Sequence, residues 1–137
     1  MTDDDLPQRG SCVESFEKPN TALKTIVTAW QMREIDGELV PNLHDDAKHD
    51  IAVIERLRDL HVEIDRWLVD LARTVPMIEL FRRRLGRAHD HILAGDSRWL
   101  VSPRLDSYHT VWFELHECLL RLAGRSRSVE ARAGRAS

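Results

Sequence analysis

Apolar residues recur at intervals of three and four along most of the chain, which is the pattern of amphipathic helices. The clearest case is the segment from about residue 46 to residue 74. Its apolar positions are Ile54, Leu57, Ile64, Leu68, Leu71 and Val75. Alternating spacings of three and four are typical of the seam between packed helices in a bundle. This segment therefore predicts one long helix with a single buried face.

Three further segments show the same pattern, at about residues 21–35, 76–94 and 103–123. Asn20 is a suitable N-cap for the first of them. Pro76 suits the first position of the second, and Gly124 is a typical C-terminal glycine for the third. Mostly short connections between such helices indicate antiparallel neighbours. The sequence predicts an all-α fold, an antiparallel four-helix bundle over residues 20–124, with no sheet because no stretch alternates with period two.

The two ends of the chain and one connection lack this pattern. Residues 1–19 contain Pro7, Gly10 and Pro19 and show no period, which predicts a flexible N-terminal lead. Residues 125–137 are rich in Arg, Ser and small residues, which predicts a flexible basic tail. The connection at residues 36–46 is too long for a minimal turn, and we expect it to cover one end of the bundle with His44.

Composition and charge restrict the class of protein. Hydrophobic residues make up 42% and charged residues 31% of the 137 residues, a balance typical of a soluble globular domain. With 20 basic against 23 acidic residues, no basic excess favours nucleic-acid binding. No apolar run approaches the roughly 20 residues that cross a bilayer. The N-terminus is acidic and only two cysteines occur, so we expect a cytoplasmic protein without a disulfide.

Several polar residues fall on faces that the pattern predicts to be buried. With Trp112 taken as the centre of the buried face of the last helix, His109 and His116 lie within the apolar arc and Tyr108 lies on its other side. Glu114 points outward by the same count.

The earlier helices add three such positions. His61 takes a seam position, Glu34 extends the stripe of the first helix by one heptad, and Gln31 lies at its edge. Buried polar groups without hydrogen bonds cost about 1–3 kcal/mol each. A group of them is therefore either a satisfied network or a site.

Three functions fit this polar interior. The first is a metal-free site for a small molecule, in which histidines serve as acid or base. The second is a metal site held by Glu34, His61 and His116. Against it, no Glu-x-x-His pair occurs, and His109 and His116 are about 10.5 Å apart along the helix axis. The third is a non-catalytic accessory or dimerisation domain, whose polar centre only gives pairing specificity.

Two charged features of the third helix favour no function. His89 and His91 fall on opposite edges of that helix, so they are expected to be solvated and not to form one site. A basic stretch follows its start, formed by Arg82, Arg83, Arg84 and Arg87. Charged helix faces are usually exposed, and we expect the same here.

Two motifs resemble a known group of proteins. They are TAWQMR at residues 28–33, followed by PNLHD at 41–45, and DSYHTVWFELHE at 106–117. Together they resemble an all-helical domain of uncharacterised actinobacterial proteins that often follows a winged-helix-like module. The resemblance covers residues 16–127. This chain has Cys118 where the second motif continues with an acid, and it does not contain the winged-helix module, so DNA binding is not expected.

The leading hypothesis is a small-molecule site in the bundle interior, with catalysis left open and no cofactor. The expected acid–base or hydrogen-bonding residues are His109, His116 and Tyr108. The expected ligand-binding residues, to which the resemblance adds weight, are Trp30, Gln31, Arg33, His44, Asp106, Trp112 and Glu114. Arg33 would favour a carboxylate or phosphate on the ligand. Neither a nucleic acid nor a membrane is an expected partner, whereas a homodimer is compatible with a bundle of this size.

Overall fold

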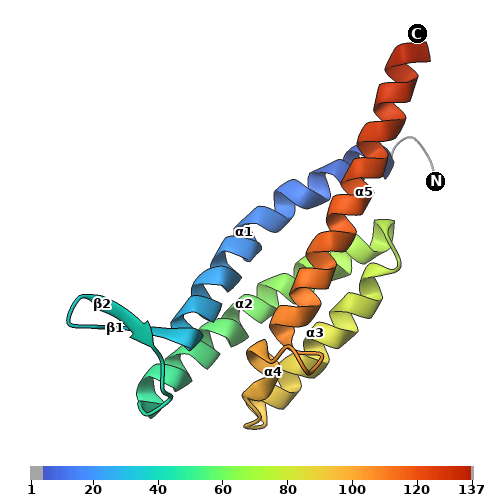
Figure 1. Cartoon of the computed structure of the whole chain (residues 1–137). Helices are drawn as coiled ribbons and strands as arrows, with labels where there is room; N and C mark the ends of the chain where they lie inside the picture. Colours follow the sequence, from blue (N-terminus) through green and yellow to red (C-terminus); the bar gives the residue numbers. More distant parts are fainter. Residues whose placement is uncertain (1–4, 137) are drawn as a thin grey trace.

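A computed structural model of the protein describes the backbone of residues 5–136 and the side chains of residues 13–124. Within residues 5–136 it contains five helices and one two-stranded sheet (Figure 1). The elements are α1 (Asp5–Gln31), β1 (Met32–Ile35), β2 (Glu38–Pro41), α2 (Ala47–Thr74), α3 (Ile78–Leu93), α4 (Arg98–Val101) and α5 (Tyr108–Ala136). The predominantly helical fold that the sequence predicts is confirmed.

Four long helices share one hydrophobic core. Helix α1 packs against α2 and α5, and α3 packs against the same two helices from the other side (Figure 1). The short helix α4 contacts α3 and α5. The largest fully buried side chains come from all four long helices and α4, and include Phe16, Leu57, Ile64, Leu85, Leu100 and Leu115. None of the helices described is long and apolar enough to cross a membrane.

The seam that the sequence predicts in α2 is largely confirmed. Leu57, Ile64 and Leu68 are buried in the core, whereas Ile54 and Leu71 lie half-buried at its edge. The helix begins after Asp46, whose side chain accepts hydrogen bonds from the backbone N–H groups of the first turn. Such an N-cap satisfies donors that have no partner within the helix.

Helix α1 is longer than the sequence predicts. The expected boundary at residue 20 is wrong, because the helix begins at Asp5 and Phe16 is buried in the core. The indole Nε1 of Trp67 in α2 also donates a hydrogen bond to Ser15 Oγ at 3.1 Å. One buried aromatic gives no periodic signal, and Pro19 favours a helix break. We infer that the free energy gained by burying Phe16 is larger than the cost of the backbone hydrogen bond that Pro19 removes.

Both ends of α5 also differ from the prediction. The helix begins at Tyr108 and not at residue 103, with buried Ser107 accepting a hydrogen bond from the Thr110 N–H. Its backbone stays helical past Gly124 to Ala136, so the expected end at Gly124 is wrong. In Figure 1 this last part of α5 extends beyond the other helices.

The connection between α1 and α2 is a β-hairpin, which contradicts the prediction of no sheet. Strand β1 pairs antiparallel with β2, with Ile35 opposite Glu38. Asp36 and Gly37 between them both have positive φ, at 53° and 83°. Two such residues form the tight turn that joins twisted strands, and Asp-Gly is a strong signal for it. Because the chain leaves the helix at Gln31, Glu34 lies exposed in β1 and not in the interior.

Candidate functional site

A groove between α1 and α5 brings together four of the predicted site residues. Gln31 comes from α1, and His109, Trp112 and His116 come from α5. The groove has a volume of about 520 Å³, and its other lining residues are Asn20, Leu23, Lys24, Val27, Thr28 and Phe113. It lies at the surface, so the predicted location in the bundle interior is wrong.

Helix geometry explains why these side chains share the groove. Residues that are three, four and seven positions apart lie on one face of a helix. The lining residues from α1 and those from α5 both have these spacings. On a count of 100° per residue, the centre of the buried face of α5 lies about 40° from Trp112, on the side of Val111. This shift moves His109 and His116 from the core to the edge of the buried face. His109 is accordingly exposed and His116 is half-buried.

Trp112 forms the wall of the groove, and its indole is held on two sides. Its Nε1 donates a buried hydrogen bond to Asn20 Oδ1 at 3.0 Å. The Phe16 ring stacks on Trp112 with centroids 4.7 Å apart and on His116 at 4.7 Å. A flat side chain held in this way loses little freedom when a ligand packs on it. Two of the residues that fix this wall, Phe16 and Asn20, lie outside the predicted site.

The groove is basic in character. Among its lining residues there is no Asp or Glu, and Lys24 is the one with a permanent charge. Lys24, Thr28 and Asn20 also line the groove, and none of them was predicted from the sequence to be a site residue. Their spacing from Gln31 by multiples of about one helical turn was the signal that could have found them.

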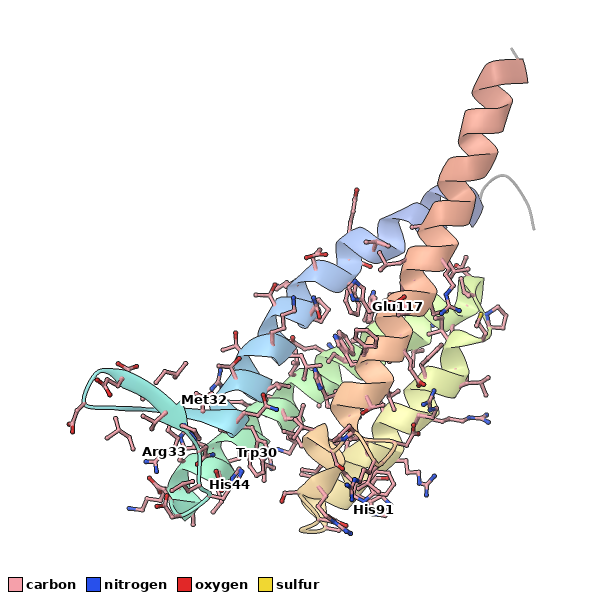
Figure 2. All side chains as sticks on the ribbon, viewed as in Figure 1. Trp30, Met32, Arg33, His44, His91 and Glu117 are labelled. Atoms are coloured by element: carbon pink, nitrogen blue, oxygen red, sulfur yellow. The ribbon has the colours of Figure 1, made fainter. Side chains whose placement is uncertain are left out.

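A second group of predicted residues lies at the base of the hairpin. Figure 2 shows Trp30, Arg33 and His44 there, with His91 in another part of the molecule. The rings of Trp30 and His44 are 4.5 Å apart. Arg33 forms ion pairs with Asp45 at 3.2 Å and Asp46 at 3.1 Å. Because its guanidinium already holds two carboxylates, Arg33 does not contribute its charge to the groove.

Hydrogen bonds show that this second group is a structural joint. Buried Asn42 donates from Nδ2 to the Trp30 carbonyl at 2.8 Å and to Asp50 Oδ1 at 3.0 Å. His44 Nδ1 donates to Asp50 Oδ2 at 3.0 Å. Burial raises the pKa of Asp50, but the hydrogen bonds from Asn42 and His44 outweigh it and the pKa is lowered. The ionised carboxylate thus fastens the hairpin to α2, and Asn42 satisfies a terminal carbonyl of α1.

Tyr108 lies in the core and not in the groove. Its hydroxyl contacts His61 Nδ1 at 2.9 Å, and the His61 ring stacks on His89 with centroids 4.1 Å apart. His89 is only 7% exposed, so the prediction that it is solvated is wrong. Burial lowers the pKa of His89 to about 4, lowers that of His61 and raises that of Tyr108. Both imidazoles are therefore neutral at pH 7, which the apolar surroundings favour.

Asp106 and Glu114 form ion pairs with an arginine and do not line the groove. Arg84 of α3 donates from Nε to Asp106 Oδ2 at 2.9 Å and also holds Glu114. Glu114 is exposed, as the helix count predicts. In the same basic stretch, Arg82 bonds to Asp65 of α2 at 2.8 Å. The expectation that this stretch is simply solvated is therefore wrong for Arg82 and Arg84, which link neighbouring elements.

The residues proposed for a metal are not brought together. Glu34 is exposed on the hairpin, His61 pairs with Tyr108 in the core, and His116 stacks on Phe16 at the groove. Across the residues that the structure describes, no group of three or more His, Cys, Asp and Glu side chains could hold a metal ion. The predicted ligand set of Glu34, His61 and His116 is therefore wrong. As expected, His89 and His91 do not share a site, since His91 stacks on Trp99.

Comparison with known proteins finds no matching family model, no matching curated protein and no matching solved structure. The resemblance to the actinobacterial helical domain stays a prediction. We therefore infer the function from the geometry of the described residues.

Proposed function

We propose that the groove between α1 and α5 is the functional site and that it binds a small organic molecule. One observation carries the proposal: Gln31, His109, Trp112 and His116, which sequence reasoning selects, line the same hollow. An apolar floor with a few convergent polar groups is the usual form of a ligand site. The four long helices, as an antiparallel bundle, would serve as the rigid support of this groove.

The positions of the two histidines define the size of the ligand. His109 and His116 are seven residues apart, which is about 10.5 Å along the axis of α5. A ligand that contacts both must extend over about two helical turns. Histidine is a common acid–base residue in enzymes, so acid–base catalysis is the reaction type that this site would support. Tyr108, in contrast, would act only through the core.

A screen of metabolites by thermal shift tests the proposal. The blocked variant is Thr28→Trp, which places a large side chain on an exposed lining position. Its matched control is Thr25→Trp, on the same helix and also exposed but outside this groove. We expect a hit to stabilise the wild type and the Thr25→Trp variant, and not the Thr28→Trp variant. Equal stabilisation of all three proteins would place the ligand elsewhere.

A turnover assay with such a ligand would separate binding from catalysis. If the groove is catalytic, His109→Ala or His116→Ala removes turnover while the helical circular dichroism is kept. If binding alone is the function, both variants weaken the complex and no product forms with any of the proteins. Loss of the helical signal in His116→Ala would mean that its stacking on Phe16 is structural.

Exposed apolar side chains favour a second function, that of an accessory or dimerisation domain. Phe113 is 61% exposed and Met77 is 49% exposed, and both line a hollow between α3 and α5. Large exposed hydrophobics that gather on one surface are typical of interaction sites. Light scattering over a range of concentrations tests this function. A dimer that Phe113→Ser dissociates would support it, and a monomer at every concentration would contradict it.

A further inference from the structure

The charges around the groove indicate the chemical class of its ligand, an inference that rests on the proposed function. Several arginines elsewhere in the described part of the chain have local counter-charges. Arg33 pairs with Asp45 and Asp46, Arg82 with Asp65, and Arg84 with Asp106. The carboxylates near these arginines are therefore already used. None of these carboxylates lines the groove.

Lys24 differs from these arginines. It forms no ion pair with a carboxylate among residues 13–124. It is exposed at the rim of a groove whose other lining residues are apolar, neutral polar or histidine. Lys24 therefore offers an ammonium at the rim of the groove with no carboxylate among the other lining residues.

Lys24 and Thr28 also line a second hollow on the other side of α1. That hollow has a volume of about 470 Å³, and its lining also includes Met32, Arg33, Glu34 and Leu39 of the hairpin and His49 near the start of α2. The two residues therefore form a ridge between two hollows. A group bound at this ridge can receive a hydrogen bond from the Thr28 hydroxyl and a charge from Lys24. A Lys ammonium suits an oxygen anion because it donates three hydrogen bonds.

We propose that the groove binds an amphipathic organic anion. Its flat apolar body would pack on exposed Phe113 and on the small exposed parts of Trp112, Leu23 and Val27. Its anionic oxygens would lie at Lys24 and Thr28. His109 and Gln31 at the end of the groove remain able to bond to a second polar group. A carboxylate, a sulfonate and a phosphate ester share this chemistry. The sequence pointed to Arg33 for this charge, but tertiary ion pairs occupy that residue and Lys24 takes its place.

Two fluorescent probes with the same aromatic body test this inference. Anilinonaphthalene sulfonate carries an anion, and phenylnaphthylamine is the same body without it. We expect Lys24→Met to weaken the sulfonate probe about tenfold, the scale of a hydrogen-bonded charge contact. The same variant should leave the neutral probe within about twofold. Lys48→Met, which removes an exposed lysine outside the groove, is the matched control and should change neither probe.

Competition with matched anions then identifies the anionic group. Naphthoate and naphthyl phosphate differ only in the group that would contact Lys24. The one that displaces the sulfonate probe at the lower concentration gives the preferred chemistry. Displacement should be lost in Lys24→Met and kept in Lys48→Met. Displacement by neither compound would overturn the inference.

The outcomes separate this inference from the proposed function. If Lys24→Met weakens both probes equally, or affects neither, the inference that the ligand is an anion is wrong. The proposal that the groove is the binding site is not affected by that result. Binding of both probes to Thr28→Trp as tightly as to the wild type would mean that the groove is not their site, which would contradict both proposals. Because the sulfonate probe also binds partly unfolded proteins, each variant must first show a cooperative unfolding transition.

Discussion

The indole Nε1 of Trp112 donates a hydrogen bond to Oδ1 of Asn20 across 3.0 Å, although the two residues are 92 positions apart in the sequence. Both groups are buried, so each satisfies the other where water has no access. The bond joins α5 to α1 at the wall of the groove that Trp112 forms. It therefore couples the shape of the candidate site to the packing of the two helices that form it.

Loss of this bond should destabilise the protein. Asn20→Ala leaves the indole N–H buried without an acceptor, which costs about 1–3 kcal/mol in the free energy of unfolding. Urea denaturation followed by circular dichroism measures the change. Thr21→Ala, at an exposed neighbouring position of α1, should stay within about 0.5 kcal/mol of the wild type. An Asn20→Ala variant as stable as this control would show that the bond contributes nothing.

Phe16 tests whether the first half of α1 belongs to the fold. Its ring is buried against Trp67, Trp112 and His116. Phe16→Ala removes this packing and should cost about 3–5 kcal/mol in the free energy of unfolding. Glu17→Ala, at an exposed adjacent position, is the control and should have little effect. A small effect of Phe16→Ala would support the flexible lead that the sequence predicts.

Stability should fall as the pH is lowered, because His89 is buried and neutral in the folded protein. Its pKa is about 4 when folded and about 6.5 in the unfolded chain. Between these values the unfolded state binds more protons, so the free energy of unfolding decreases by about 2 kcal/mol from pH 7.5 to pH 5. Arg58 and His61 of α2 oppose the protonation of His89, whereas Asp90 of α3 favours it.

The variant His89→Leu should remove most of this pH dependence. It also replaces Nε2, a buried atom without a hydrogen-bond partner in the described part of the protein, so it should cost little stability at pH 7.5. His91→Leu removes a half-exposed histidine of the same helix and should keep the wild-type slope. Urea denaturation at several pH values gives both slopes. If stability depends on pH as steeply in His89→Leu as in the wild type, His89 is not the source of the pH dependence.

Tyr108 should affect stability and not ligand binding. Tyr108→Phe removes the hydroxyl that contacts His61 Nδ1 and should cost about 1 kcal/mol in the free energy of unfolding. Because Tyr108 does not line the groove, the variant should bind the sulfonate probe as the wild type does. Lys24→Met, at the exposed rim, serves as the comparison and should weaken binding of the sulfonate probe without altering stability. Impaired binding in Tyr108→Phe would support the hydrogen-bonding role at the ligand site that is expected from the sequence.

Helix periodicity predicted the helices at the centre of the fold and missed the features without a period. The seam of α2 was identified because repeated burial on one face leaves a repeated pattern. Phe16 was missed because a single aromatic before Pro19 gives no such pattern, yet it packs against three rings from two other helices. The hairpin was missed although Asp36-Gly37 is a strong turn signal, since its strands are only four residues long.

The sequence by itself determined which residue types face one side of each helix, because 3.6 residues per turn relate spacing directly to direction. Together with the resemblance, that count selected Gln31, His109, Trp112 and His116, although it assigned them to the interior together with Tyr108. Only the tertiary structure decided which side chain meets which. It paired Arg33 with Asp45 and Asp46, placed Tyr108 on His61, and left Lys24 beside the groove without a carboxylate. Ion pairs and buried hydrogen bonds join residues far apart in sequence, and helix periodicity carries no information about such contacts.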